Sequence, residues 1–129
     1  MKQNKIVVLI IFMFIIMVVF SSCSKPPDGI DRDLWQDSVK VVKIIKDAFE
    51  KDNNLSVKDE EFVDRYFKIY KGRLYDNKDE NILINNIQKL YKNYKTYLFS
   101  KKTFSDEDFV NEDKQKVLNL FVKIENLIN

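Results

Sequence analysis

Carboxylates are the side chains of this sequence with the clearest catalytic potential. They cluster at Asp59-Glu60-Glu61 and at Asp106-Glu107-Asp108. Two carboxylates at a defined separation can hydrolyse a glycosidic bond, which makes a glycan-acting enzyme one candidate. Each cluster, however, falls where a helix is expected to begin, and acidic side chains in a first turn are favoured by the helix dipole. We therefore interpret both clusters as helix starts and assign no catalytic residue.

Composition excludes several other catalytic and metal-binding arrangements. The chain contains no histidine, which rules out Ser–His–Asp and Cys–His catalysis and histidine-containing zinc sites. Gly29 and Gly72 stand alone, so there is no glycine-rich phosphate loop. Residues 52–56 resemble the start of a calcium loop, but Val57 and Val63 occupy the positions where that loop needs glycine and glutamate. We expect no metal site and no cofactor other than a covalent lipid.

The first 22 residues have the composition of a secretory signal peptide. Lys2 and Lys5 make the start positive, and Ile6 to Phe20 follow as 15 uninterrupted apolar residues. At about 1.5 Å per residue a helix of this length covers about 22 Å, less than the roughly 30 Å hydrocarbon core of a bilayer. Two serines follow at once. Residues 1–22 are therefore predicted to be a removable signal peptide rather than a membrane-spanning anchor.

The only cysteine of the chain lies directly after this segment. The run Phe20-Ser21-Ser22-Cys23 resembles the lipobox of bacterial lipoproteins. The resemblance implies that a diacylglyceryl group is attached to the Cys23 sulfur and that the signal is cut just before this residue. Acyl chains such as palmitate would then hold the mature protein on the extracytoplasmic face of the cell membrane. The alternatives are an uncleaved signal anchor with a free thiol and an ordinary signal peptide beside an incidental cysteine.

Residues 23–129, the expected mature chain, suit one domain of neutral charge. The two lysines of the signal peptide account for the whole excess of 22 basic over 20 acidic residues. A nucleic-acid-binding protein needs a net basic surface, so we expect no nucleic-acid partner. Residues 23–30 contain two prolines and a glycine, and are predicted to be the lipidated cysteine and an extended tether.

Residues 31–129 are predicted to form a small all-α domain, because apolar residues recur every three or four positions in four segments. The expected helices cover residues 31–51, 57–71, 78–99 and 106–128. Cap-like pairs support three of the starts: Ser56 with Asp59, Asn77 with Glu80, and either Ser105 with Asp108 or Thr103 with Asp106. Gly72 is expected to end the second helix with a positive φ. Short connections favour a four-helix bundle, with a helical repeat as the competing arrangement.

Two groups of side chains on the third expected helix form a candidate interaction surface. They are a basic stripe of Lys89, Lys92 and Lys95, and an aromatic group of Tyr91, Tyr94 and Tyr97. Lysines attract anionic headgroups or an acidic partner, and tyrosines suit interfaces because they combine apolar area with a hydroxyl. The plainer interpretations are a solvated helix face for the lysines and the edge of the core for the tyrosines.

Together these features favour a membrane-anchored, non-enzymatic lipoprotein that binds another protein of the cell envelope. Small lipoproteins of this kind include accessory factors of envelope machinery and exclusion or immunity proteins, an analogy of size, location and helicity. One alternative is an envelope enzyme that acts on glycan through carboxylates, and another is a carrier of lipid or a small ligand. The expected partners are the membrane, through the lipid anchor, and an envelope protein whose identity the sequence leaves open.

Overall fold

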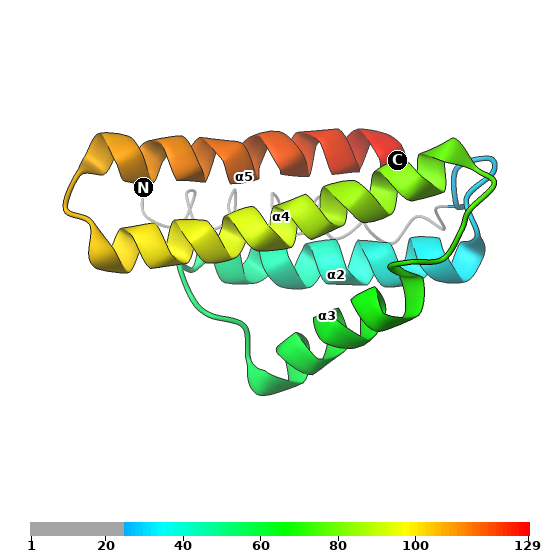
Figure 1. Cartoon of the computed structure of the whole chain (residues 1–129), viewed down its shortest axis with the longest axis horizontal. Helices are drawn as coiled ribbons and strands as arrows, with labels where there is room; N and C mark the ends of the chain where they lie inside the picture. Colours follow the sequence, from blue (N-terminus) through cyan, green and yellow to red (C-terminus); the bar gives the residue numbers. More distant parts are fainter. Residues whose placement is uncertain (1–24) are drawn as a thin grey trace, which may run out of the picture.

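The structure, a computed structural model, describes residues 25–129 as four helices. They are α2 (Arg32–Glu50), α3 (Val57–Tyr70), α4 (Lys78–Thr103) and α5 (Glu107–Ile128), and no strand occurs among the described residues (Figure 1). The all-α class and the four-helix bundle predicted from the hydrophobic pattern are confirmed. The predicted signal peptide and Cys23 lie outside the described residues.

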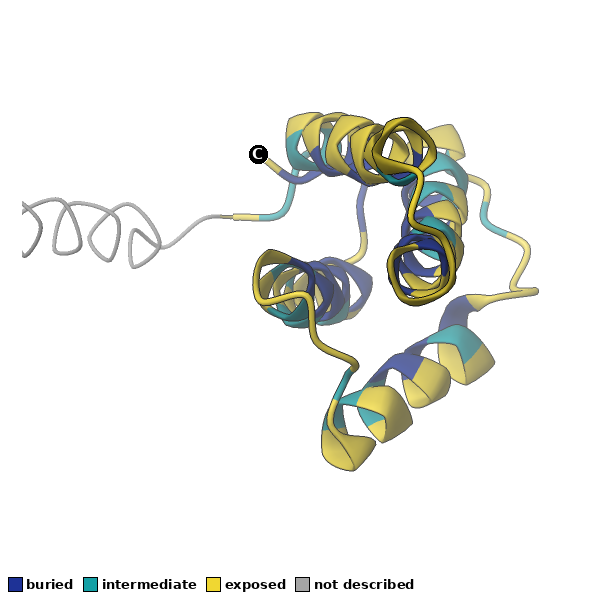
Figure 2. Ribbon diagram, turned by 90° about the vertical axis from the view of Figure 1, so that its left-hand side faces the viewer, coloured by how far each residue is buried: buried dark blue, intermediate teal, exposed yellow. Residues whose placement is uncertain are grey.

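The helices surround a single core. α4 and α5 form an antiparallel hairpin along the length of the bundle, and α2 lies beside both of them (Figure 1). α3 is shorter, is inclined to the other three and packs mainly on α2. In Figure 2 the buried faces of the helices point toward one another. They enclose one cluster of aliphatic and aromatic side chains.

The buried face of α2 shows how the sequence pattern produces this core. Leu34, Ser38, Val41 and Ile45 follow one another at intervals of three or four residues, which places them on one side of a helix. All four are fully buried. Burying one large aliphatic side chain is worth about 1.5–3 kcal/mol, so α2 is stabilised mainly by tertiary packing rather than by helix propensity.

The chain joins the bundle earlier than the sequence predicts. Ile30, which the sequence pattern places in the tether, is buried in the core, and its N–H donates to the carbonyl oxygen of Pro27 at 3.1 Å. The side-chain amide of Asn77 donates to the carbonyl oxygen of Gly29, whose φ of 85° favours glycine. The tether therefore ends near Pro27, because the turn that follows packs against the start of α4.

Polar contacts from two other helices hold the start of α2. The carboxylate of the N-cap residue Asp31 accepts hydrogen bonds from the N–H groups two and three residues later, both at 3.0 Å. Its own N–H donates to Oε1 of the buried Glu80 in α4 at 2.7 Å. The predicted pairing of Glu80 with Asn77 is thus wrong, although Asn77 is the N-cap of α4. Nearby, Trp35 Nε1 donates to the carbonyl oxygen of Ile128 in α5 at 3.0 Å.

The ends of α3 and α5 confirm two predicted helix signals and correct a third. Ser56 is the N-cap of α3, and its hydroxyl accepts from the N–H three residues later at 3.2 Å. Gly72, just after α3, has the predicted positive φ, 91°. At the start of α5 the N-cap is Asp106, rather than Ser105 or Thr103. A carboxylate in this position accepts two backbone hydrogen bonds where a hydroxyl was expected.

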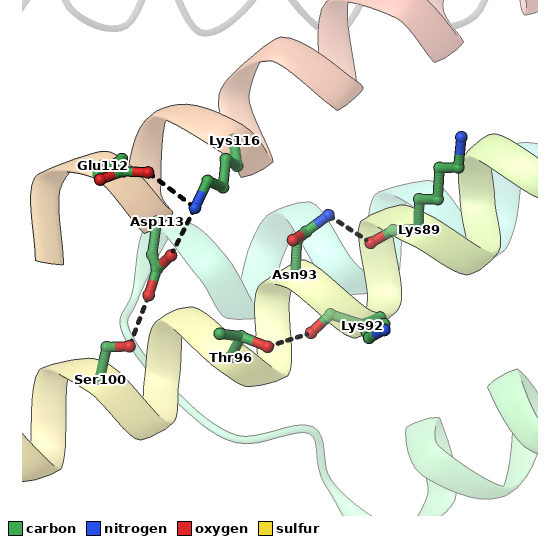
Figure 3. A network of polar contacts seen from close by, with 8 residues as sticks. All are labelled: Lys89, Lys92, Asn93, Thr96, Ser100, Glu112, Asp113 and Lys116. Atoms are coloured by element: carbon green, nitrogen blue, oxygen red, sulfur yellow. Dashed lines mark hydrogen bonds and ion pairs between the residues drawn. The ribbon is translucent and has the colours of Figure 1, made fainter. Parts of the chain in front are cut away.

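α4 is longer than predicted, because it continues past residue 99 to Thr103. Ser100 is buried, and its hydroxyl donates to Oδ2 of Asp113 in α5 at 2.6 Å (Figure 3). Asp113 is also buried and accepts from Lys116 Nζ at 3.3 Å. A buried carboxylate needs hydrogen-bond donors, so this contact favours another helical turn at a place where the apolar pattern has already ended.

Candidate interaction surface

The predicted basic stripe lies on the exposed side of α4. Lys89 and Lys92 are exposed, and with Asn85 and Gln88 they line an open hollow of about 330 Å³. Figure 3 shows the Lys89 side chain extending away from the other labelled side chains. Within residues 25–129, neither ammonium group has an ion-pair partner. The chemistry that these two side chains offer is attraction of an anionic group.

Lys95, the third residue of the stripe, lies over an aromatic ring. Its Nζ is 4.2 Å from the centroid of the Tyr91 ring. A cation–π contact at an exposed position is worth about 0.5–1 kcal/mol. The Lys95 ammonium therefore already contacts the protein, which leaves Lys89 and Lys92 as the more available cations.

Tyr91, Tyr94 and Tyr97 lie in the core and do not share the exposed surface of the lysines, which corrects their inclusion in the candidate interaction surface. Their exposed fractions are 9%, 1% and 3%. The hydroxyl of Tyr94 donates to the carbonyl oxygen of Asn53, and that of Tyr97 donates to Oδ1 of Asp52 at 2.6 Å. Both acceptors belong to the connection between α2 and α3, so the tyrosines form the edge of the core and fasten this connection to α4.

The same contacts shift the acidity of the groups involved. Burial disfavours the phenolate and raises the pKa of Tyr94 and the pKa of Tyr97 to about 12, and in Tyr97 the hydrogen bond to Asp52 adds to the effect. For Asp52, hydrogen bonds from Lys101 and then from Tyr97 lower the pKa below its ordinary 3.8. Asp52 is therefore held as the anion, and Tyr97 as the neutral donor.

The two acidic clusters occupy the first turns of α3 and α5, as expected. Asp59 accepts a hydrogen bond from the Ser56 hydroxyl at 2.9 Å, and Asp106 accepts one from the N–H of Asp108 at 3.0 Å. Among residues 25–129, no three Asp, Glu or Cys side chains are grouped so that they could hold a metal ion. None of the four described helices combines the length and the apolar character needed to cross a membrane.

A group of exposed aromatic rings, which hydrophobic periodicity does not reveal, lies around the connection between α4 and α5. Phe99, Phe104 and Phe109 are 62%, 46% and 46% exposed. The ring centroids of the first pair are 6.3 Å apart, and those of the second pair are 5.2 Å apart. We call these three residues the phenylalanine tip. Their spacing of five positions matches neither a helix face nor a strand face, and the sequence signal that remains is three phenylalanines in a polar segment.

Comparison with known proteins identifies no relative: no protein-family model, no curated protein and no solved structure matches this chain.

Proposed function

We propose that this chain is a lipid-anchored protein of the bacterial cell envelope that acts by binding another envelope protein rather than by catalysis. The observation that carries the proposal is the lipobox-like run Phe20-Ser21-Ser22-Cys23, which contains the only cysteine of the chain. Accessory, exclusion and immunity lipoproteins have the same combination of small size, membrane address and helical domain. Within this proposal Lys89, Lys92 and Lys95 remain a predicted contact surface.

The number of residues between Cys23 and the bundle limits how far the domain can lie from a lipid on this cysteine. The chain packs on the bundle from the turn that begins at Pro27. The four residue steps from Cys23 to Pro27 span at most about 14 Å when fully extended. Two or more acyl chains, at about 0.8 kcal/mol per buried CH₂, are sufficient for stable attachment. A lipid on Cys23 would therefore hold the start of α2 close to the bilayer, and this attachment does not require a net charge on the domain.

Metabolic labelling with radioactive palmitate tests the anchor. The full chain is expressed in a bacterial host as wild type, as Cys23→Ser and as Ser24→Ala, a matched control that alters the neighbouring residue and keeps the cysteine. We expect label in the wild type and in the control, with both proteins in the membrane fraction, and no label in Cys23→Ser. Undiminished labelling of Cys23→Ser contradicts the lipoprotein assignment.

The binding role needs a separate experiment. The full chain is tagged at its C-terminus, crosslinked in cells of its native host and purified from detergent-solubilised membranes. We expect to recover one or a few proteins with this chain that are not recovered with an unrelated lipoprotein treated in the same way. Recovery of no specific protein contradicts the proposed binding function while leaving the anchor unaffected.

A further inference from the structure

The phenylalanine tip exposes more apolar surface than the fold requires. The Phe104 ring pairs with the rings of Phe99 and Phe109, but none of the three residues belongs to the core or to the partly buried shell around it. Leu98 and Ser100, on either side of Phe99, are both buried. The exposure of Phe99 is therefore specific to its position on the helix. Contiguous exposed apolar patches mark interaction sites in soluble domains. Aromatic side chains are also enriched at the centres of protein interfaces.

The tip lies at the opposite end of the bundle from the membrane tether. Figure 1 shows the connection between α4 and α5 at one end of the molecule and residues 25–31 at the other. α4 alone has 26 residues, which corresponds to about 39 Å along the helix axis. Because the tether from Cys23 spans only about 14 Å, a lipid anchor there leaves the tip on the side of the bundle that faces away from its attachment point. This step rests on the proposed lipid anchor.

The charges around the tip disfavour a lipid surface. Residues 99–112 contain two lysines and four acidic residues, a formal charge of −2. Lys101 is already paired with Asp52, and Glu112 is paired with Lys116. Lys102 and the three acids at residues 106–108 remain, which keeps the local charge at −2. Glu107 and Asp108, which directly precede Phe109 in the chain, are exposed. Anionic lipid headgroups give a membrane surface a negative potential, which repels an acidic tip and attracts basic groups. A basic protein surface is the complementary partner.

We propose that the phenylalanine tip binds an apolar groove rimmed by lysine or arginine on a second envelope protein. The three rings supply the desolvated centre of the interface, and the acids at the start of α5 supply a charged rim that selects and orients the partner. The proposal places this contact at the end of the hairpin and leaves the lysine stripe as a separate predicted surface.

Site-specific photo-crosslinking in the native host tests this assignment. In the full-length protein Phe104 is replaced by p-benzoylphenylalanine, and in a control the same probe replaces Val122, which is exposed on α5 (58%) and outside the tip. We expect a discrete protein adduct from position 104 and none from position 122. The partner is identified by mass spectrometry, and its adduct is then followed in two further variants.

The first variant, Phe99→Ser with Phe109→Ser, is expected to lower the yield of the adduct at least tenfold. The second, Glu107→Lys with Asp108→Lys, is expected to lower it several-fold. A matched variant, Val57→Ser, removes an exposed apolar side chain outside the tip and is expected to leave the yield unchanged. Circular dichroism of each purified variant checks that helix content and Tm are retained, since none of the substituted residues is buried.

An adduct with lipid, an adduct with a second copy of the chain, no adduct, or an adduct insensitive to the phenylalanine substitutions overturns the proposal. Palmitate labelling of the same strains separates this failure from failure of the anchor. Absence of a protein adduct from position 104 in a chain that carries the palmitate label rejects the tip alone. A tip-dependent adduct in a protein without label rejects the anchor and retains the tip.

Discussion

The hydrogen bond between Ser38 Oγ and Tyr66 Oη, 2.8 Å long, joins α2 to α3 inside the core. Both residues are almost completely buried. Tyr66→Phe removes the hydroxyl and preserves the ring, which packs against Phe67 at 5.3 Å and against Tyr70 at 5.0 Å between centroids. Leaving a buried hydroxyl without its partner costs about 1–3 kcal/mol. A helical serine can also bond the carbonyl four residues earlier, so we expect the lower part of this range, about 1–2 kcal/mol.

A double-mutant cycle in urea measures this contribution. The free energy of unfolding is determined for wild type, Tyr66→Phe, Ser38→Ala and the double variant. We expect the double variant to lose less than the sum of the two single losses, with a coupling energy of at least about 0.5 kcal/mol. Tyr75→Phe is the control, because its hydroxyl makes only a 3.3 Å bond in a partly exposed position, and its loss should be about 0.5 kcal/mol. Losses that add within about 0.3 kcal/mol refute the reasoning.

Three further predictions concern the C-terminal end of α2 and the part of α4 that packs on it. Phe49→Ala removes a buried ring that packs at 5.2 Å from the Tyr97 ring, and should lower the free energy of unfolding by about 3–5 kcal/mol in urea. Asp52→Asn breaks the ion pair with Lys101, while asparagine still tolerates the positive φ at this position. Because both side chains are partly exposed, the free energy of unfolding at pH 7 should fall by about 0.5–1 kcal/mol. Because the folded-state pKa of Asp52 is lowered, this difference from wild type should be present above pH 3.8 and shrink as the pH falls below it; a constant difference refutes the assignment. Tyr94 and Tyr97 have folded-state pKa values raised to about 12, so their contribution to stability should be complete below pH 10 and be lost between pH 10 and 12; tyrosinate absorbance at 295 nm that rises fully near pH 10 without unfolding contradicts this.

Much of the fold follows from patterns that are local in sequence. The interval of three or four residues between Leu34, Ser38 and Val41 is enough to predict α2 and its buried face. Ser56 and Gly72 mark the ends of α3 because capping and a positive φ depend on neighbouring backbone groups alone. Such signals predict the number of helices and the all-α class without knowledge of how the helices pack.

The contacts that the sequence does not reveal are those between residues far apart in the chain. Glu80 has the spacing of a local cap, but its carboxylate binds the N–H of Asp31, 49 positions earlier. Tyr97 is of a residue type that is common at interfaces, but its hydroxyl donates to Asp52, 45 positions earlier, and its ring lies in the core. A tyrosine at the edge of a core and a tyrosine at an interface are the same residue in a similar sequence pattern, so only the tertiary arrangement distinguishes them.

The candidate surfaces divide in the same way. The exposure of Lys89 and Lys92 follows from their place on the polar side of a regular helix, which periodicity predicts. The phenylalanine tip depends on the turn between α4 and α5, which brings together the rings of residues that no regular period places on one face. The extra turn of α4 determines where that connection begins. It is stabilised by the hydrogen bond between Ser100 and Asp113, so the pattern of apolar residues does not predict it.

The contacts around the start of α2 also determine how the domain would bear a mechanical load. A pull on the proposed lipid anchor would reach the folded chain near Pro27. There the N–H of Asp31 is held by Glu80 in α4, and the Trp35 indole is held by the carbonyl of Ile128 at the end of α5. Tension on α2 is thus transmitted directly to α4 and α5, so the three helices resist it together. Unfolding α2 from its start would require these hydrogen bonds to α4 and α5 to break first, so the domain is crosslinked at the point where a lipid anchor would pull on it.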